Sequence, residues 1–314
     1  MHAGRRPPRP ARAGPPGAAQ GRWALSTAVA VVLAVCAAAC NALSSVLQRR
    51  AARAASPDRD FSARLFLSLV RQPVWIAAIG VLIVAFLLQA AALGLAGLTL
   101  VQPILVIELP FTLFIVRLMF KVRLRAREWT AILSLTGGLA LLLVATGAET
   151  GIESPDRAGW VAAALTTVLL VAALVAVSRL GAGGRRAALL GVASGLCFAF
   201  TAALMKDSVD VLSASPAAVL RTWQVYAMVA AGIAALYLLQ NALHHGTLVV
   251  VQPSLTVTDP VASIGFGVAL FGDTIRLGLW AVPELAGIAL LFFGSVRLSQ
   301  SPYVTYDGVT RRNR

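Results

Sequence analysis

The chain has 314 residues, of which 58% are hydrophobic and only 13% are charged, whereas a typical soluble domain is about 25% charged. Its mean hydropathy is +0.80 and its net charge is +14. So few charged residues cannot cover the surface of a soluble domain of this size, and so apolar a chain is not disordered. The composition therefore predicts a polytopic membrane protein.

A basic tail comes first in the chain. Residues 1–23 are rich in Arg, Pro, Gly and Ala, a composition typical of disorder. Nine apolar segments follow, each near the roughly 20 residues that cross a bilayer as a helix. They are residues 24–48, 74–95, 98–120, 129–147, 158–180, 186–208, 218–243, 247–271 and 278–298. We therefore expect an all-α fold with about nine transmembrane helices, an arginine-rich polar loop at 49–72, and a C-terminal tail at 299–314.

The first apolar segment has a second interpretation. An arginine-rich start, an apolar run and small residues near Cys40 are also typical of a secretory signal, including the lipoprotein kind. An internal repeat gives this segment a counterpart later in the chain, which favours a structural helix over a cleaved signal.

That repeat relates the two halves of the sequence. The clearest matches, at an offset of 150 or 151, are Leu-Leu-Gln at 87–89 and 238–240, Val-Gln-Pro at 101–103 and 251–253, and Pro110 with Pro260. A weaker match at an offset of 157 pairs Cys40, Ser44, Leu47 and Arg49 with Cys197, Thr201, Leu204 and Lys206. Internal similarity of this kind indicates a duplicated structural unit.

The repeat predicts the architecture. The two units are residues 24–147 and 186–298, each with four helices, and the helix at 158–180 links them. One linking helix between two units of four inverts the second unit relative to the first. Inverted repeats are typical of secondary transporters, whose substrate site lies near the midplane where the halves meet.

The basic residues predict an orientation, because Lys and Arg accumulate in cytoplasmic loops. With the N-terminus outside, 18 of the 27 basic residues fall in inner loops and the C-terminal region, and nine fall outside. We therefore expect a multi-pass protein of the cell membrane with an outer N-terminus and a cytoplasmic C-terminus.

Several of these features resemble a known family. Val-Gln-Pro in a span, a basic loop ending in Glu128 and Trp129, and a span containing Gly137 and Gly138 are similar to the EamA-type repeat of the drug/metabolite transporter superfamily. The similarity covers roughly residues 24–50, 74–147 and 186–298. Members of that superfamily usually have ten spans. The nine-span pattern here resembles the branch that includes NIPA-type magnesium transporters, so the resemblance implies a transporter without naming its substrate.

Three acidic residues lie inside apolar spans, each next to a proline: Glu108, Asp259 and Glu284. An ionised side chain at the bilayer centre costs roughly 2.5–3.5 kcal/mol on insertion scales, so such residues need a role. Proline frees a backbone carbonyl, and an acid beside free carbonyls can bind a proton or cation. The alternative is an acid paired with a neighbouring helix for structure.

Helical spacing adds candidates around Asp259. Gln252, Thr256, Asp259 and Ser263 share one helix face, which we expect to face a cavity or another helix. The matching stripe in the first half begins at Gln102 and is otherwise apolar. The further candidates for substrate or ion binding are Gln89 and Gln240 of the repeated Leu-Leu-Gln, Asn41 and Gln48 in the first span, and Tyr226, Tyr237 and Asn241 in the seventh. For the last two groups, interhelical hydrogen bonds and interfacial anchoring are the alternatives.

These features lead to three hypotheses about function. The first is a secondary transporter that moves a small metabolite, drug or cation by alternating access, and the second is a NIPA-like transporter of magnesium or another divalent cation. The third is a membrane scaffold without transport activity. We expect no enzyme and no cofactor, because the sequence lacks metal clusters and nucleophile motifs. We expect no nucleic-acid partner, because most of the basic residues fall in the predicted inner loops and C-terminal region, where they act as an orientation signal. Gly191 and Gly195 form a GxxxG pair, which predicts a close contact with another helix, either within the chain or in a homodimer.

Overall fold

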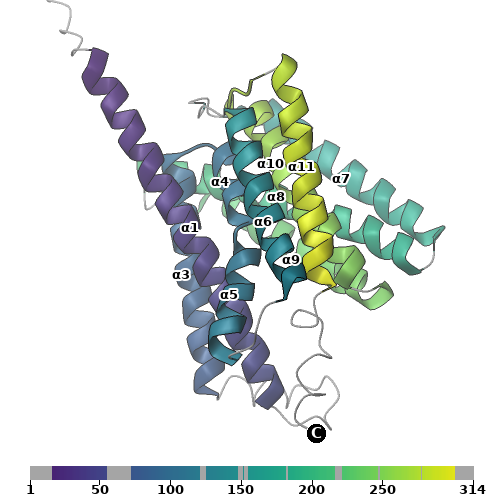
Figure 1. The fold of residues 1–314 in the computed structure, drawn as a ribbon. Coiled ribbons are helices and arrows are strands. Elements are labelled where there is room, and N and C mark those ends of the chain that lie inside the picture. The colour runs from purple at the N-terminus through teal and green to yellow at the C-terminus, as the bar shows by residue number, and fades with distance from the viewer. Residues whose placement is uncertain are drawn as a thin grey trace, which may run out of the picture.

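The computed structural model describes residues 16–54, 72–120, 125–147, 151, 155–181, 183–215, 221–246, 248–276 and 278–300. The regular elements of this part of the chain are helices (Figure 1). They are α1 (Pro16–Ala54), α3 (Pro73–Leu95), α4 (Leu98–Leu105), α5 (Glu108–Phe120), α6 (Ala126–Thr146), α7 (Arg157–Arg179), α8 (Gly183–Ala214), α9 (Trp223–His245), α10 (Leu248–Phe271), the short 3-10 helix η2 (Gly278–Trp280) and α11 (Ala281–Ser299).

Nine segments of the described chain are long and apolar enough to cross a membrane. The predicted all-α fold is therefore confirmed for the described residues, and the nine apolar segments support the prediction of a multi-pass membrane protein. The third span consists of α4 and α5 together, and the ninth of η2 and α11. For most span ends, the predicted and observed limits agree to within a few residues. The sixth span is the main difference, because α8 has 32 residues and runs on to Ala214.

The first helix is longer at both ends than the sequence predicted. It begins at Pro16, within the expected disordered tail 1–23, and continues to Ala54, within the expected loop 49–72. Proline is well tolerated at the first position of a helix, and alanine and arginine, which dominate residues 49–54, are strong helix formers. Residues 1–15, 55–71 and 301–314, which include the rest of both predicted tails and of this loop, lie outside the described residues.

Local sequence sets several helix ends. Asp156 caps α7, because its carboxylate accepts a hydrogen bond from the backbone N–H of Gly159. At the start of α6, the backbone N–H of Arg125 donates to the carboxylate of Glu128 at 2.8 Å. The same helix ends at Gly147, whose φ of 49° is left-handed, a conformation that glycine adopts without a steric penalty.

The helices pack in pairs that recur in the two halves of the chain. α1 packs along α3 as α8 packs along α9, and α1 contacts α4 and α5 as α8 contacts α10. Between the halves, α6 packs along α11, α4 contacts α10, and α3 contacts α8. Figure 1 shows α6 and α11 side by side. α8 is the most buried span and α7 the least, so α7 is peripheral.

Two glycines bring the central helices α8 and α10 together. A Cβ atom on Gly195 would lie 2.8 Å from the Cβ of Thr258, and one on Gly191 would lie 3.1 Å from the Cβ of Ser254. Only small residues allow backbones to approach this closely. The GxxxG pair is therefore used within the chain, against α10.

Candidate functional site

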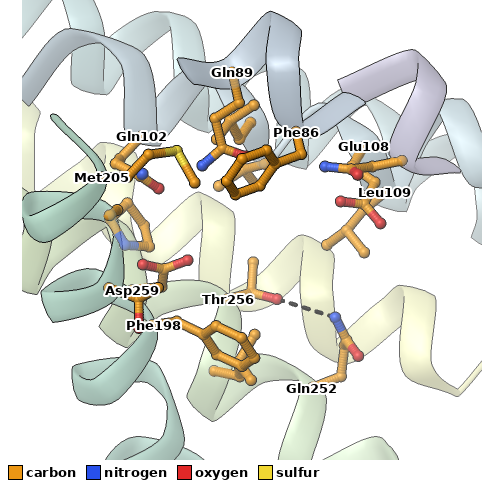
Figure 2. A pocket seen from close by; sticks show the side chains of 17 residues that line it. Phe86, Gln89, Gln102, Glu108, Leu109, Phe198, Met205, Gln252, Thr256 and Asp259 are labelled. Carbon is orange, nitrogen blue, oxygen red and sulfur yellow. Dashed lines mark hydrogen bonds between the residues drawn. The ribbon is translucent and has the colours of Figure 1, made fainter. Parts of the chain in front are cut away.

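A cavity of about 420 Å³ lies between helices of the two halves (Figure 2). Helices α1, α3, α4 and α5 of the first half and α8 and α10 of the second half contribute to its wall. Its size is within the usual range for small-molecule sites, roughly 300–1,000 Å³. Seven predicted site residues line it: Asn41, Gln89, Gln102, Glu108, Gln252, Thr256 and Asp259.

The third span is interrupted at this cavity. α4 ends at Leu105 and α5 begins at Glu108. Hydrogen bonds between residues three apart, as in a 3-10 turn, join the two helices. The N–H of Val106 donates to the carbonyl of Pro103 at 3.2 Å, and the N–H of Leu109 donates to the carbonyl of Val106 at 3.1 Å. Pro110 has no N–H, so it cannot donate to the carbonyl of Val106, which accepts from Leu109 instead.

The interruption places Glu108 in the first turn of α5. The N-terminus of a helix carries a partial positive charge that favours a nearby carboxylate. In the second half, α10 contains Pro253 and Pro260 but is one continuous helix. The equivalent spans of the two halves therefore differ in backbone conformation.

Asp259 extends from the middle of α10 and has one weak partner. The hydroxyl of Ser263 donates to its Oδ1 at 3.4 Å, well beyond the roughly 2.7–2.8 Å of a good O–H···O bond. One turn earlier, the amide of Gln252 donates to the hydroxyl of Thr256, also at 3.4 Å. The predicted stripe thus points three side chains to the cavity, while Ser263 is completely buried.

The side-chain amide of Gln102, in the cavity wall, is buried and has an N–H group without an acceptor among the described residues. Its side chain is only 4% exposed, and its Nε2 has no hydrogen-bond partner among the described residues. A buried N–H group without an acceptor costs about 1–3 kcal/mol. An acceptor atom bound in the cavity would remove that cost.

The rest of the wall is mostly apolar and consists of side chains that the sequence analysis did not propose as site residues. Phe86 and Phe198 lie on opposite sides of the cavity in Figure 2. The remaining lining residues are Leu105, Val106, Leu109, Thr201, Ala202, Met205, Leu255 and Pro260. Apolar residues are common throughout the spans, so no single one stands out before the helices are packed.

The repeat would have identified part of this wall. Ten of the lining residues form five pairs, and the two members of each pair are separated by one of the offsets, 150 or 157, that relate the two halves of the sequence. These pairs are Gln102 with Gln252, Leu105 with Leu255, Val106 with Thr256, Leu109 with Asp259, and Asn41 with Phe198. Both halves therefore present equivalent positions to the same cavity, with different side chains.

Six predicted site residues lie away from the cavity. Glu284 is in the first turn of α11, and Tyr226 and Tyr237 are 64% and 68% exposed on the outer surface of α9. The others make local contacts or face outward: Asn241 donates to the carbonyl of Tyr237, Gln48 donates to the hydroxyl of Ser44, and Gln240 is exposed. α9 packs chiefly along α8, and none of its described residues lines the cavity.

A polar cluster that the sequence analysis missed follows Met205 on α8. The ammonium of Lys206, a residue only 6% exposed, lies 3.4 Å from the carbonyl of Leu93, 3.5 Å from the carboxylate of Asp210, and 5.1 Å from the ring centre of Phe271. This one side chain therefore connects α8 with α3 and α10. An acid four residues after a lysine is the signal that would have found the ion pair.

No group of three or more His, Cys, Asp or Glu side chains that could hold a metal ion occurs among the described residues. Of the three acids beside prolines, Glu108 and Asp259 share the cavity and Glu284 does not. The three acids therefore do not converge on one site.

Comparison with known proteins shows similarity along most of the chain. The chain is 25% identical over 269 residues to an uncharacterized protein of Corynebacterium glutamicum, a match that covers 85% of this chain and 92% of the relative. No family model and no solved structure matches the chain. The match extends over nearly the whole of both proteins, so the relative has similar segments throughout rather than a single shared motif.

Proposed function

We propose that this protein is a secondary transporter that moves a small molecule or cation across the cell membrane by alternating access. The observation that carries the proposal is the cavity between the halves, lined by equivalent positions of the two repeats. A substrate site at the meeting of two inverted repeats has this property, because the pseudo-symmetry axis passes through it.

Two features support this function over a scaffold. Seven of the predicted polar site residues line one cavity, and a span is interrupted where it borders that cavity. Irregular backbone inside a membrane occurs where it lines a cavity or is buried in protein. The matching helix contacts within each half support an inverted repeat, and the distribution of basic residues supports an outer N-terminus and a cytoplasmic C-terminus.

The experiment is a two-sided accessibility measurement that needs no known substrate. In a variant with Cys36, Cys40 and Cys197 replaced by alanine, Thr201→Cys places one thiol at the cavity. We expect a membrane-impermeant thiol reagent to label it from outside in intact cells and from inside in inverted vesicles, because the cavity opens alternately to each side.

The matched control is Ser194→Cys on the same helix. Ser194 is completely buried and donates to the carbonyl of Ala235 on α9, so a thiol there should remain unlabelled from both sides. Protection of both thiols from both sides would contradict transport and favour a scaffold.

A further inference from the structure

The charges around the cavity are unbalanced. Two of its lining residues are acids, Asp259 and Glu108, and none is Lys, Arg or His. Lys206 is next in sequence to the lining residue Met205, but its ammonium contacts Leu93 and Asp210 instead. Among the described residues that line it, the cavity therefore has acidic side chains and no basic ones.

Asp259 is the group that most needs such a ligand. A carboxylate removed from water is costly unless a counter-charge and hydrogen bonds compensate it. The hydroxyl of Ser263 donates to Asp259 at 3.4 Å, which is too long to compensate a full charge. A bound cation would supply the missing partner.

The walls favour an organic cation over a metal ion. Magnesium requires a compact octahedron of oxygen ligands and retains several waters, whereas Figure 2 shows Asp259 and Glu108 at opposite ends of the cavity. Between them lie the rings of Phe86 and Phe198. Aromatic faces attract cations, and they also pack against alkyl groups.

The amide of Gln102 adds a second feature to the ligand. Its Nε2 is buried without an acceptor, and Figure 2 shows Gln102 on the same side of the cavity as Asp259. A ligand whose positive nitrogen approaches Asp259 would place an oxygen a few bonds away within reach of this amide. Such an oxygen would satisfy the buried N–H.

We propose that the cavity binds an organic ammonium ion, with its positive nitrogen at Asp259, its alkyl groups between Phe86 and Phe198, and a neighbouring oxygen at Gln102. The inference rests on the proposed function and names the substrate class of the same cavity.

The test is calorimetric binding to the purified full-length protein with matched probes. Choline carries an ammonium and a hydroxyl, 3,3-dimethyl-1-butanol is its uncharged isostere, and benzyltrimethylammonium carries the charge without an oxygen. We expect both ammonium probes to bind, and the uncharged isostere and magnesium chloride to bind at least tenfold more weakly.

Equal affinity for choline and its isostere, tighter binding of magnesium, or no binding of either ammonium probe would overturn the proposal. This comparison uses the unmodified protein, so it does not depend on how a variant folds.

Substitutions locate the binding site. Asp259→Asn should weaken both ammonium probes at least tenfold, and Gln102→Leu should weaken choline several-fold more than benzyltrimethylammonium. Glu284→Gln is the matched control, since this acid also lies beside a proline in a span but does not line the cavity, and it should leave both affinities unchanged. Equal losses in the Asp259 and Glu284 variants would contradict the assignment.

The outcome separates the substrate class from the function. Two-sided labelling of Thr201→Cys without binding of an ammonium probe would reject the organic cation and leave the transporter. Protection of that thiol from both sides would reject the transporter whatever the probes do.

Discussion

Carboxyl groups beside prolines have three different environments in this protein. Asp259 faces the cavity from a continuous helix, Glu108 faces it from the first turn of α5, and Glu284 lies in the first turn of α11 away from it. The same local pattern therefore has different consequences, because the helix positions decide which carboxylates a ligand can reach.

Transport should depend on one of these acids and not on another. Asp259→Asn keeps the size of the side chain and removes the charge, so we expect uptake of radiolabelled choline into proteoliposomes to fall at least tenfold. The thermal unfolding midpoint should not fall, because a carboxylate held in a membrane span by one long hydrogen bond contributes cost rather than stability. Uptake in Glu284→Gln should match that of the unmodified protein, and equal losses in both variants would contradict the role of Asp259.

At the scale of the helix, the contact between α6 and α11 depends on glycine. A Cβ atom on Gly138 would lie 2.8 Å from the carbonyl oxygen of Gly287, and one on Gly287 would lie 2.9 Å from the carbonyl oxygen of Gly138. The two backbones therefore touch at this crossing. Because α6 belongs to the first half and α11 to the second, the crossing also joins the halves.

Adjacent glycines of α6 make a matched test of that contact. Gly138→Ala should destabilise the protein by about 1–3 kcal/mol, as overpacking of a close contact does. Gly137→Ala adds a Cβ that has no atom within 4 Å, so it should be neutral or stabilise the helix by up to about 1 kcal/mol. Thermal unfolding in detergent measures both, and similar midpoints for the two variants would show that the crossing is looser than described.

At the scale of the whole molecule, one buried acid ties distant segments together. Asp273 is 2% exposed and follows the end of α10. Its carboxylate accepts from the backbone N–H of Thr99 at 3.1 Å, in the first turn of α4, and from that of Gly151 at 2.8 Å. A single side chain thus joins the second half to the first half and to the segment before α7.

Removing this link should loosen the whole protein. Asp273→Ala leaves two backbone N–H groups without their acceptor, at about 1–3 kcal/mol for each group that stays buried, so we expect a clear fall in the unfolding midpoint. Asp273→Asn keeps one acceptor oxygen and should lose less. Asp156→Ala, which removes an exposed cap of α7, should cost only about 1 kcal/mol. A smaller loss in Asp273→Ala than in Asp156→Ala would contradict the role of Asp273.

Much of the fold could be predicted from the sequence, because bilayer physics acts on single segments. Backbone groups in lipid must be bonded within their own helix, so each long apolar run becomes a span whatever its neighbours are. Helix ends outside the lipid are less constrained. For this reason α1 extends to Pro16 and Ala54, beyond the limits that composition and hydropathy indicated.

Part of the cavity could also be anticipated, since ionisable and amide side chains are rare enough in spans to be noticed. Asp259, Glu108 and Gln102 stand out in this way, and all three line the cavity. Tyr226 and Tyr237 satisfied a similar helical-face pattern but face outward on α9. Periodicity shows which residues share a face, but it does not show which way that face points.

By itself, the sequence of this protein determined the nine apolar spans found in its described part and the repeat between the two halves, because hydropathy and internal similarity are properties of the chain alone. Only the tertiary structure decided that Asp259 and Glu108 share a cavity with Phe86 and Phe198 while Glu284 is excluded. The physical reason is that close helix contacts, such as Gly195 against Thr258 and Gly138 against Gly287, set the rotation of each helix. That rotation determines which side chains face the cavity.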